Sequence, residues 1–144
     1  MTQQDTIKLL RECDAGISMG LSAIDEVIGY VENADFVRVL SESREAHEKL
    51  GREVQEQLVL CREEGKEPNP VTKTMSQLMT EVKLKLHESD KTIADLMTDG
   101  SNMGVKSLNR YLNQYKAADE YTKDIAKRLI NLEEKLSIQM RDFL

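Results

Sequence analysis

The two histidines, His47 and His87, are the first residues to test for chemistry, because imidazole serves both as a metal ligand and as a general base. Helical bundles that bind a pair of metal ions use Glu-x-x-His motifs, in which the three-residue spacing places carboxylate and imidazole on one face. In this chain Arg44 and Leu84 stand three residues before the two histidines. The motif is missing, so we do not expect a di-metal oxidation site of that kind.

A metal site with fewer ligands is an alternative. His47 lies on an apolar helical stripe, and turns placed where Gly, Pro and Asn cluster would bring it level with Glu88. The same turns place Asp14, Glu81 and Asp119 at another common level. These five residues are suited to hold Fe, Mn or Zn, and the three carboxylates alone suit a hard cation. The alternative is a buried histidine satisfied by hydrogen bonds, with carboxylates that pair with Lys or Arg.

A catalytic site has less support than a metal site. The chain has no Gly-rich phosphate loop after a strand, and its Ser residues have no evident base. Cys13 and Cys61 form no metal-spaced motif, so we interpret them as reduced thiols of a cytoplasmic protein. These observations favour a non-enzymatic protein with no predicted cofactor other than the metal considered above.

Helical periodicity supplies the elements that would position these residues. Apolar side chains at steps of three, four and seven residues indicate four helices, at about 3–32, 35–64, 70–97 and 102–143. Asn33, Gly65–Pro70 and Asp99–Asn102 carry the turn signals between them. Short connections favour antiparallel neighbours, so residues 1–144 are expected to form one all-α domain, an antiparallel four-helix bundle with up-down-up-down topology.

The last predicted helix is the longest, because apolar positions recur every seven residues from Leu108 to Phe143. Such a helix would be roughly 63 Å long, against roughly 45 Å for each of the first two. It either overhangs the bundle or kinks and folds back near residues 116–119. An overhanging apolar stripe needs a partner, so we expect a homodimer.

Composition restricts the possible partners. The net charge of −6 argues against nucleic acid and against anionic membrane surfaces. No apolar run approaches the ~20 residues of a membrane-spanning helix. Four glycines fall within helical pattern, where they suit either close helix packing or a ligand held against the backbone: Gly16, Gly20, Gly29 and Gly104.

Several segments resemble a known group of proteins. Arg11–Ile17, Glu64–Pro70, Ala94–Gly104 and Ala117–Glu120 are similar to a family of small helical-bundle proteins from anaerobic Firmicutes. The chain also resembles, more distantly, bacterial domains of unknown function in the ferritin-like superfamily. This resemblance implies a ferritin-like bundle and a cytoplasmic bacterial setting, and it implies no activity.

Three functions follow from these observations. The first is a non-enzymatic, self-associating structural or interaction module. The second is a metal-binding ferritin-like protein with a reduced carboxylate and histidine site. The third is a carrier of a small apolar ligand held near Tyr111 and Tyr115, which requires a cavity of several hundred Å³ at mid-bundle.

Overall fold

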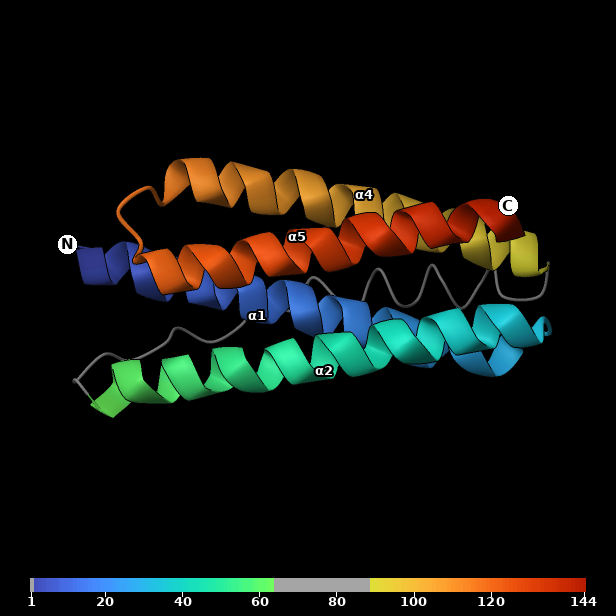
Figure 1. Cartoon of the computed structure of the whole chain (residues 1–144), viewed down its shortest axis with the longest axis horizontal. Helices are drawn as coiled ribbons and strands as arrows, with labels where there is room; N and C mark the ends of the chain where they lie inside the picture. Colours follow the sequence, from blue (N-terminus) through green and yellow to red (C-terminus); the bar gives the residue numbers. More distant parts are fainter. Residues whose placement is uncertain (1, 64–88) are drawn as a thin grey trace.

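The computed structural model describes residues 2–63 and 89–144, and this part of the chain is all-helical with no strand. Four long helices lie side by side in a bundle (Figure 1). They are α1 (Thr2–Val27), α2 (Ala34–Glu63), α4 (Asp90–Gln114) and α5 (Glu120–Met140), with short 3-10 turns at Ile28–Tyr30 and Arg141–Phe143. The predicted all-α class is confirmed.

The helices form two antiparallel hairpins, α1 with α2 and α4 with α5. Figure 1 shows α1 and α5 running in one direction and α2 and α4 in the other, with α4 beginning at the end opposite to the one where α2 ends. The described helices run up, down, down, up, and the predicted alternation stays a prediction because residues 64–88 lie outside the described residues. Residues 90–114 form a single helix, so the second hairpin includes the end of the predicted third helix as well as the predicted fourth.

Polar side chains begin three of the helices. The carboxamide of Asn33 accepts a hydrogen bond of 3.1 Å from the backbone N–H of Phe36 at the start of α2. Asp119 accepts one of 2.8 Å from Thr122 at the start of α5, and Ser89 caps α4 in the same way. Such caps satisfy N–H groups that have no partner inside the helix.

The turn predicted at Asp99–Asn102 does not form, because α4 continues through it. Glycine within a helix costs about 1 kcal/mol relative to alanine. Burial of Met97 on one side and Leu108 on the other outweighs that cost. The predicted boundaries at 97 and 102 are therefore wrong.

The chain folds back at residues 115–119 instead. Here the carboxylate of Asp5 accepts a 3.0 Å hydrogen bond from the N–H of Ala117. The Thr6 hydroxyl accepts one of 2.9 Å from the N–H of Asp119, and Ala118 between them is buried. Of the two alternatives for a long last helix, folding back near 116–119 is the one observed.

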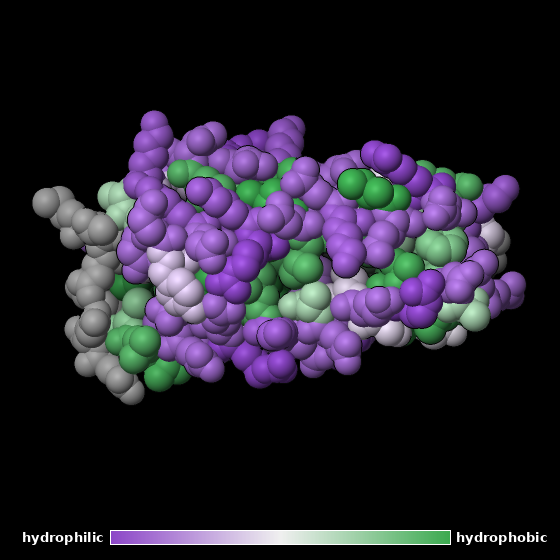
Figure 2. Space-filling view, viewed as in Figure 1, coloured by the Kyte–Doolittle hydropathy of each residue, from purple (hydrophilic) through white to green (hydrophobic). Residues whose placement is uncertain are grey.

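Among the described residues the apolar core consists of two clusters, one toward each end of the bundle. One cluster surrounds Leu10, Val54 and Leu129. The other surrounds Ile24, Phe36 and Met140, with the ring of Phe36 stacked on that of Phe143 at a centroid distance of 4.5 Å. The face seen in Figure 2 is covered mainly by hydrophilic side chains, with hydrophobic ones showing between them. Within the described ranges, no helix is long and apolar enough to cross a membrane.

Candidate functional site

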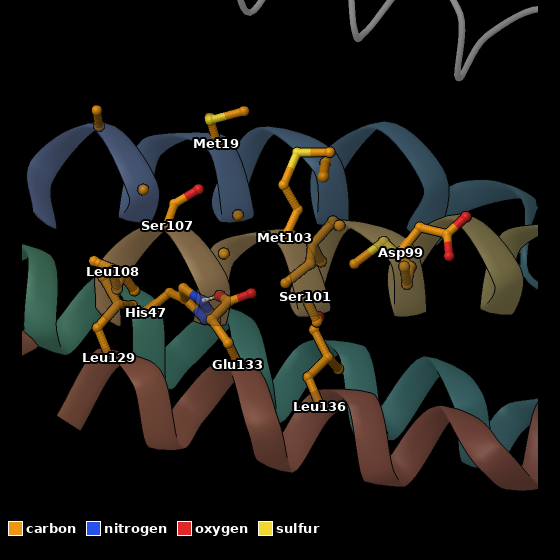
Figure 3. A pocket seen from close by; sticks show the side chains of 18 of the residues that line it. Met19, His47, Asp99, Ser101, Met103, Ser107, Leu108, Leu129, Glu133 and Leu136 are labelled. Atoms are coloured by element: carbon orange, nitrogen blue, oxygen red, sulfur yellow. Dashed lines mark hydrogen bonds and ion pairs between the residues drawn. The ribbon is translucent and has the colours of Figure 1, made fainter. Parts of the chain in front are cut away.

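A polar layer separates the two apolar clusters at mid-bundle. On α2 it lies between Leu40 and Leu50, which belong to different clusters. Its members are His47 on α2 and Glu133 on α5, both buried, which are side by side in Figure 3. Two titratable side chains at this depth are uncommon in a mainly apolar core, and so the pair is the first candidate for function.

Both ring nitrogens of His47 are engaged. Nδ1 lies 2.7 Å from the carbonyl oxygen of Ser43, one turn earlier in α2, and donates to it because a carbonyl only accepts. Nε2 lies 2.7 Å from Oε1 of Glu133. The His47 side chain is fully buried, whereas that of Glu133 is 12% exposed. The bond to Ser43 fixes the ring plane and directs Nε2 toward α5.

The surroundings of His47 raise its pKa. Burial alone acts to lower the pKa of His47, but the hydrogen bond and charge of Glu133 and the Ser43 carbonyl raise it more. The net effect is a pKa above the ordinary 6.5. Because Nδ1 donates to a carbonyl, Nε2 can donate to Glu133 only when the ring is protonated, and the raised pKa favours that form.

Two glycines make room for the pair. A Cβ atom on Gly20 of α1 would lie 3.0 Å from Cδ2 and Nε2 of His47. A Cβ atom on Gly104 of α4 would lie 3.2 Å from Oε2 of Glu133. Both distances are shorter than ordinary carbon contacts. The glycines in helical pattern at 20 and 104 thus allow the polar side chains to lie against the backbones of α1 and α4.

A cavity of about 360 Å³ lies beside the pair, between α1 and α4. Figure 3 shows His47 and Glu133 on its α2 and α5 side and Met19 and Met103 on the side of α1 and α4. Tyr111 also lines it, and the ring of Tyr111 stacks on that of Tyr115. This is the size and position that the carrier hypothesis requires.

The cavity wall is apolar with a few polar groups. Ala15, Leu108 and Leu136 are among its apolar residues. Ser101 and Ser107 add hydroxyl groups from α4. An apolar wall with a small number of convergent polar groups is typical of small-molecule sites.

The predicted metal ligands are not brought together in the described part of the chain. The Asp14 carboxylate accepts a 2.7 Å hydrogen bond from Gln55, and Asp119 caps α5 beside Thr6 at one end of the bundle. Glu81 and Glu88 lie outside the described residues.

Within residues 2–63 and 89–144, no three His, Cys, Asp or Glu side chains come close enough to share a metal ion. Coordination by His47 would break its bond to Glu133 or to Ser43. The described residues alone therefore do not form the predicted metal site, and its other two members, Glu81 and Glu88, lie outside them. The predicted common level of Asp14 and Asp119 fails because the last helix folds back at residues 115–119.

The two thiols have different surroundings, and neither cysteine forms a disulfide. Cys13 is buried in the first core cluster, and Cys61 is half-buried. Burial, with the charges of Glu12 and Asp14, raises the pKa of the Cys13 thiol to about 12. Cys13 thus stays protonated and unreactive in the folded protein.

Sequence reasoning identified His47 as a buried stripe residue but missed its partner. The available signal was the position of Glu133, four residues after Leu129 and three before Leu136. Both of those leucines are buried, so a helical wheel places the glutamate on the same face. The heptad assigned to this segment took Leu132 instead, which is only half-buried.

Comparisons of the chain with protein-family models, with curated proteins and with solved structures found no match. The resemblance to a Firmicutes family and to ferritin-like domains thus stays a prediction. Any function must be argued from the geometry of the bundle itself.

Proposed function

We propose that the protein is a non-enzymatic binding module that holds a small, mostly apolar molecule in the groove between α1 and α4. The observation that carries this proposal is the 360 Å³ cavity beside the buried pair of His47 and Glu133. Its volume falls within the range of known small-molecule sites, roughly 300–1,000 Å³. By volume it has room for about a dozen non-hydrogen atoms, since a liquid water occupies ~30 Å³.

The groove has an adaptable entrance. Met19 and Met103 both line it and are 37% and 60% exposed. Methionine is flexible and polarizable, which suits a surface that must fit around an apolar body. The hydrogen-bonded pair at the base gives such a molecule a fixed reference point, because both partners are held by packing.

Binding of a small neutral solvatochromic dye with one aromatic ring, such as 4-dimethylaminobenzonitrile, tests this proposal. Ser107 lies on α4 and points toward α1 in Figure 3, so Ser107→Leu should fill the groove and abolish the fluorescence increase. Ser41→Leu makes the same change on the exposed face of α2 and should leave dye binding intact. A wild-type protein that does not bind the dye, or a Ser107→Leu variant that binds it as well as wild type, would contradict the proposal. Circular dichroism confirms that each variant is helical.

Further parts of the sequence interpretation stay proposals. Assignment to the ferritin-like superfamily rests on the sequence resemblance and on the all-helical class of the described residues. Self-association as a homodimer was expected from an overhanging helix, but the chain folds back at residues 115–119 and that reason no longer applies. Light scattering on the purified protein measures the oligomeric state, and elemental analysis of the same sample tests the alternative of bound Fe, Mn or Zn. A cytoplasmic bacterial setting remains part of the proposal.

A further inference from the structure

The carboxylate of Glu133 presents two different oxygens. Oε1 is bonded to His47 at 2.7 Å. Oε2 lies against the backbone of Gly104, where an added Cβ atom would be 3.2 Å from it, and Gly104 itself lines the cavity. In Figure 3 this second oxygen points away from His47. One acceptor of the buried pair is thus directed at the groove, while the other holds the histidine.

The side chains that line the cavity indicate the charge of the ligand. Among the described residues, three acidic side chains line the cavity, Glu12, Asp99 and Glu133, and His47 is the basic side chain opposite them. Among the described lining residues none is Lys or Arg. Glu12 lines the cavity from α1, and burial raises the pKa of its carboxyl. A lining with an excess of carboxylates attracts a cation and repels a carboxylate or phosphate headgroup.

We propose that the ligand is a small amphiphilic amine, which donates an N–H from its ammonium group to Oε2 of Glu133 and lays its apolar body along the groove. This inference rests on the proposed function, because it names the chemical class bound at the same site. The pair of His47 and Glu133 then works as a positioning unit, in which the histidine holds the carboxylate and the carboxylate selects the headgroup. The small volume favours one alkyl chain or one aromatic ring.

The test compares three ligands with the same chain and different headgroups: octylamine, octanol and octanoate. Each is titrated into wild-type protein that carries the dye, and displacement gives the relative affinities. A charge-assisted hydrogen bond in a sheltered site corresponds to roughly 10- to 100-fold in affinity. We expect octylamine to bind more tightly than octanol by that factor, and octanoate to bind most weakly.

Two variants that each remove one carboxylate test whether Glu133 causes the preference for octylamine. Glu133→Gln keeps the shape of the side chain and should remove the preference for octylamine over octanol. Glu134→Gln makes the same change at the exposed neighbouring position of α5 and should keep it. Should Glu133→Gln fail to fold, the comparison of the three ligands on the wild-type protein still tests the preference for an amine.

The outcomes separate this inference from the function on which it rests. Equal affinity for octylamine and octanol in wild type, or an unchanged preference in folded Glu133→Gln, overturns the amine while dye binding stands. Tightest binding of octanoate overturns it as well. Failure of wild type to bind the dye or any octyl ligand overturns the proposed function first.

Discussion

Two charged pairs join α2 to α5, about two turns apart along the helices, and they have opposite surroundings. His47 and Glu133 lie in the interior, opposite two glycines and between the two apolar clusters. Glu53 and Arg128 lie at the surface, where the guanidinium donates two hydrogen bonds of 2.7 and 2.9 Å to the carboxylate. Their side chains are 27% and 40% exposed.

The difference teaches what each pair contributes. A buried pair loses its hydration on folding, so its net stabilisation is small, yet removal of one partner leaves an uncompensated charge. A surface pair keeps most of its hydration, so both its formation and its removal change the free energy of unfolding little. The inner pair therefore defines a site and its geometry, whereas the outer pair only adjusts stability.

The largest expected effect comes from breaking the inner pair on one side only. His47→Leu should reduce the free energy of unfolding by about 3–5 kcal/mol, because the carboxylate of Glu133 loses its cation in the interior. The double variant His47→Leu with Glu133→Leu should recover most of that loss, since apolar residues then fill the space. Urea denaturation of the two variants measures both values. A double variant as unstable as the single one would show that the loss is one of packing and not of charge.

The next largest effect on stability is expected from filling the space that Gly20 leaves opposite His47. Gly20→Ala should reduce the free energy of unfolding by about 1–3 kcal/mol, because the His47 ring is held at both nitrogens and cannot give way. Gly100→Ala is the matched control, since a Cβ atom there meets nothing within 4 Å. That control should gain about 0.5–1 kcal/mol from helix propensity. Thermal unfolding of the two proteins compares them, and equal destabilisation would contradict the packing argument.

The stabilisation that each pair gives should also depend on pH, and in opposite directions: that of the inner pair is lost as the pH rises, and that of the outer pair as the pH falls. The folded-state pKa of His47 lies above 6.5, so its contribution is complete below that pH and is lost as the pH rises through the folded value. Wild-type stability should decline on the alkaline side, and the double leucine variant should lack this decline. Urea unfolding at a series of pH values measures the slopes, and parallel slopes would count against a charged His47.

The smallest effect is expected at the surface pair. Hydrogen bonds from Arg128 and Tyr121 lower the pKa of Glu53 from 4.5 to about 2. Its contribution is therefore present above pH 4.5 and is lost as the pH falls toward 2. Glu53→Gln should reduce the free energy of unfolding near neutrality by no more than about 1 kcal/mol, and less in high salt. A larger loss that resists salt would show that the pair is less hydrated than its exposure indicates.

The first hairpin was predictable because its signals are local. Apolar periodicity predicted helices at 3–32 and 35–64, and the structure has Thr2–Val27 with a short 3-10 turn and Ala34–Glu63. Asn33 acts as the cap between them, as a polar residue with a free side-chain acceptor can do from its own position in the chain. Local turn chemistry and side-chain periodicity were sufficient here.

The second hairpin was not predictable in the same way. The strong turn signal at Asp99–Asn102 is overridden by burial on both sides of it. The turn that forms, at residues 115–119, contains neither glycine nor proline. It is held by hydrogen bonds to Asp5 and Thr6, more than a hundred residues earlier in the chain.

The sequence alone determined that this protein is helical, where its first two helices lie, and that His47 belongs to a buried stripe, because each follows from periodicity along the chain. Only the tertiary structure decided which carboxylate meets that histidine, which glycines admit the pair, and that a groove opens between α1 and α4. Those features depend on how each helix is rotated about its own axis and on how far it is shifted along that axis relative to its neighbours. Glu133 and Gly20 contact His47, and Gly104 contacts Glu133, only once the described helices are packed.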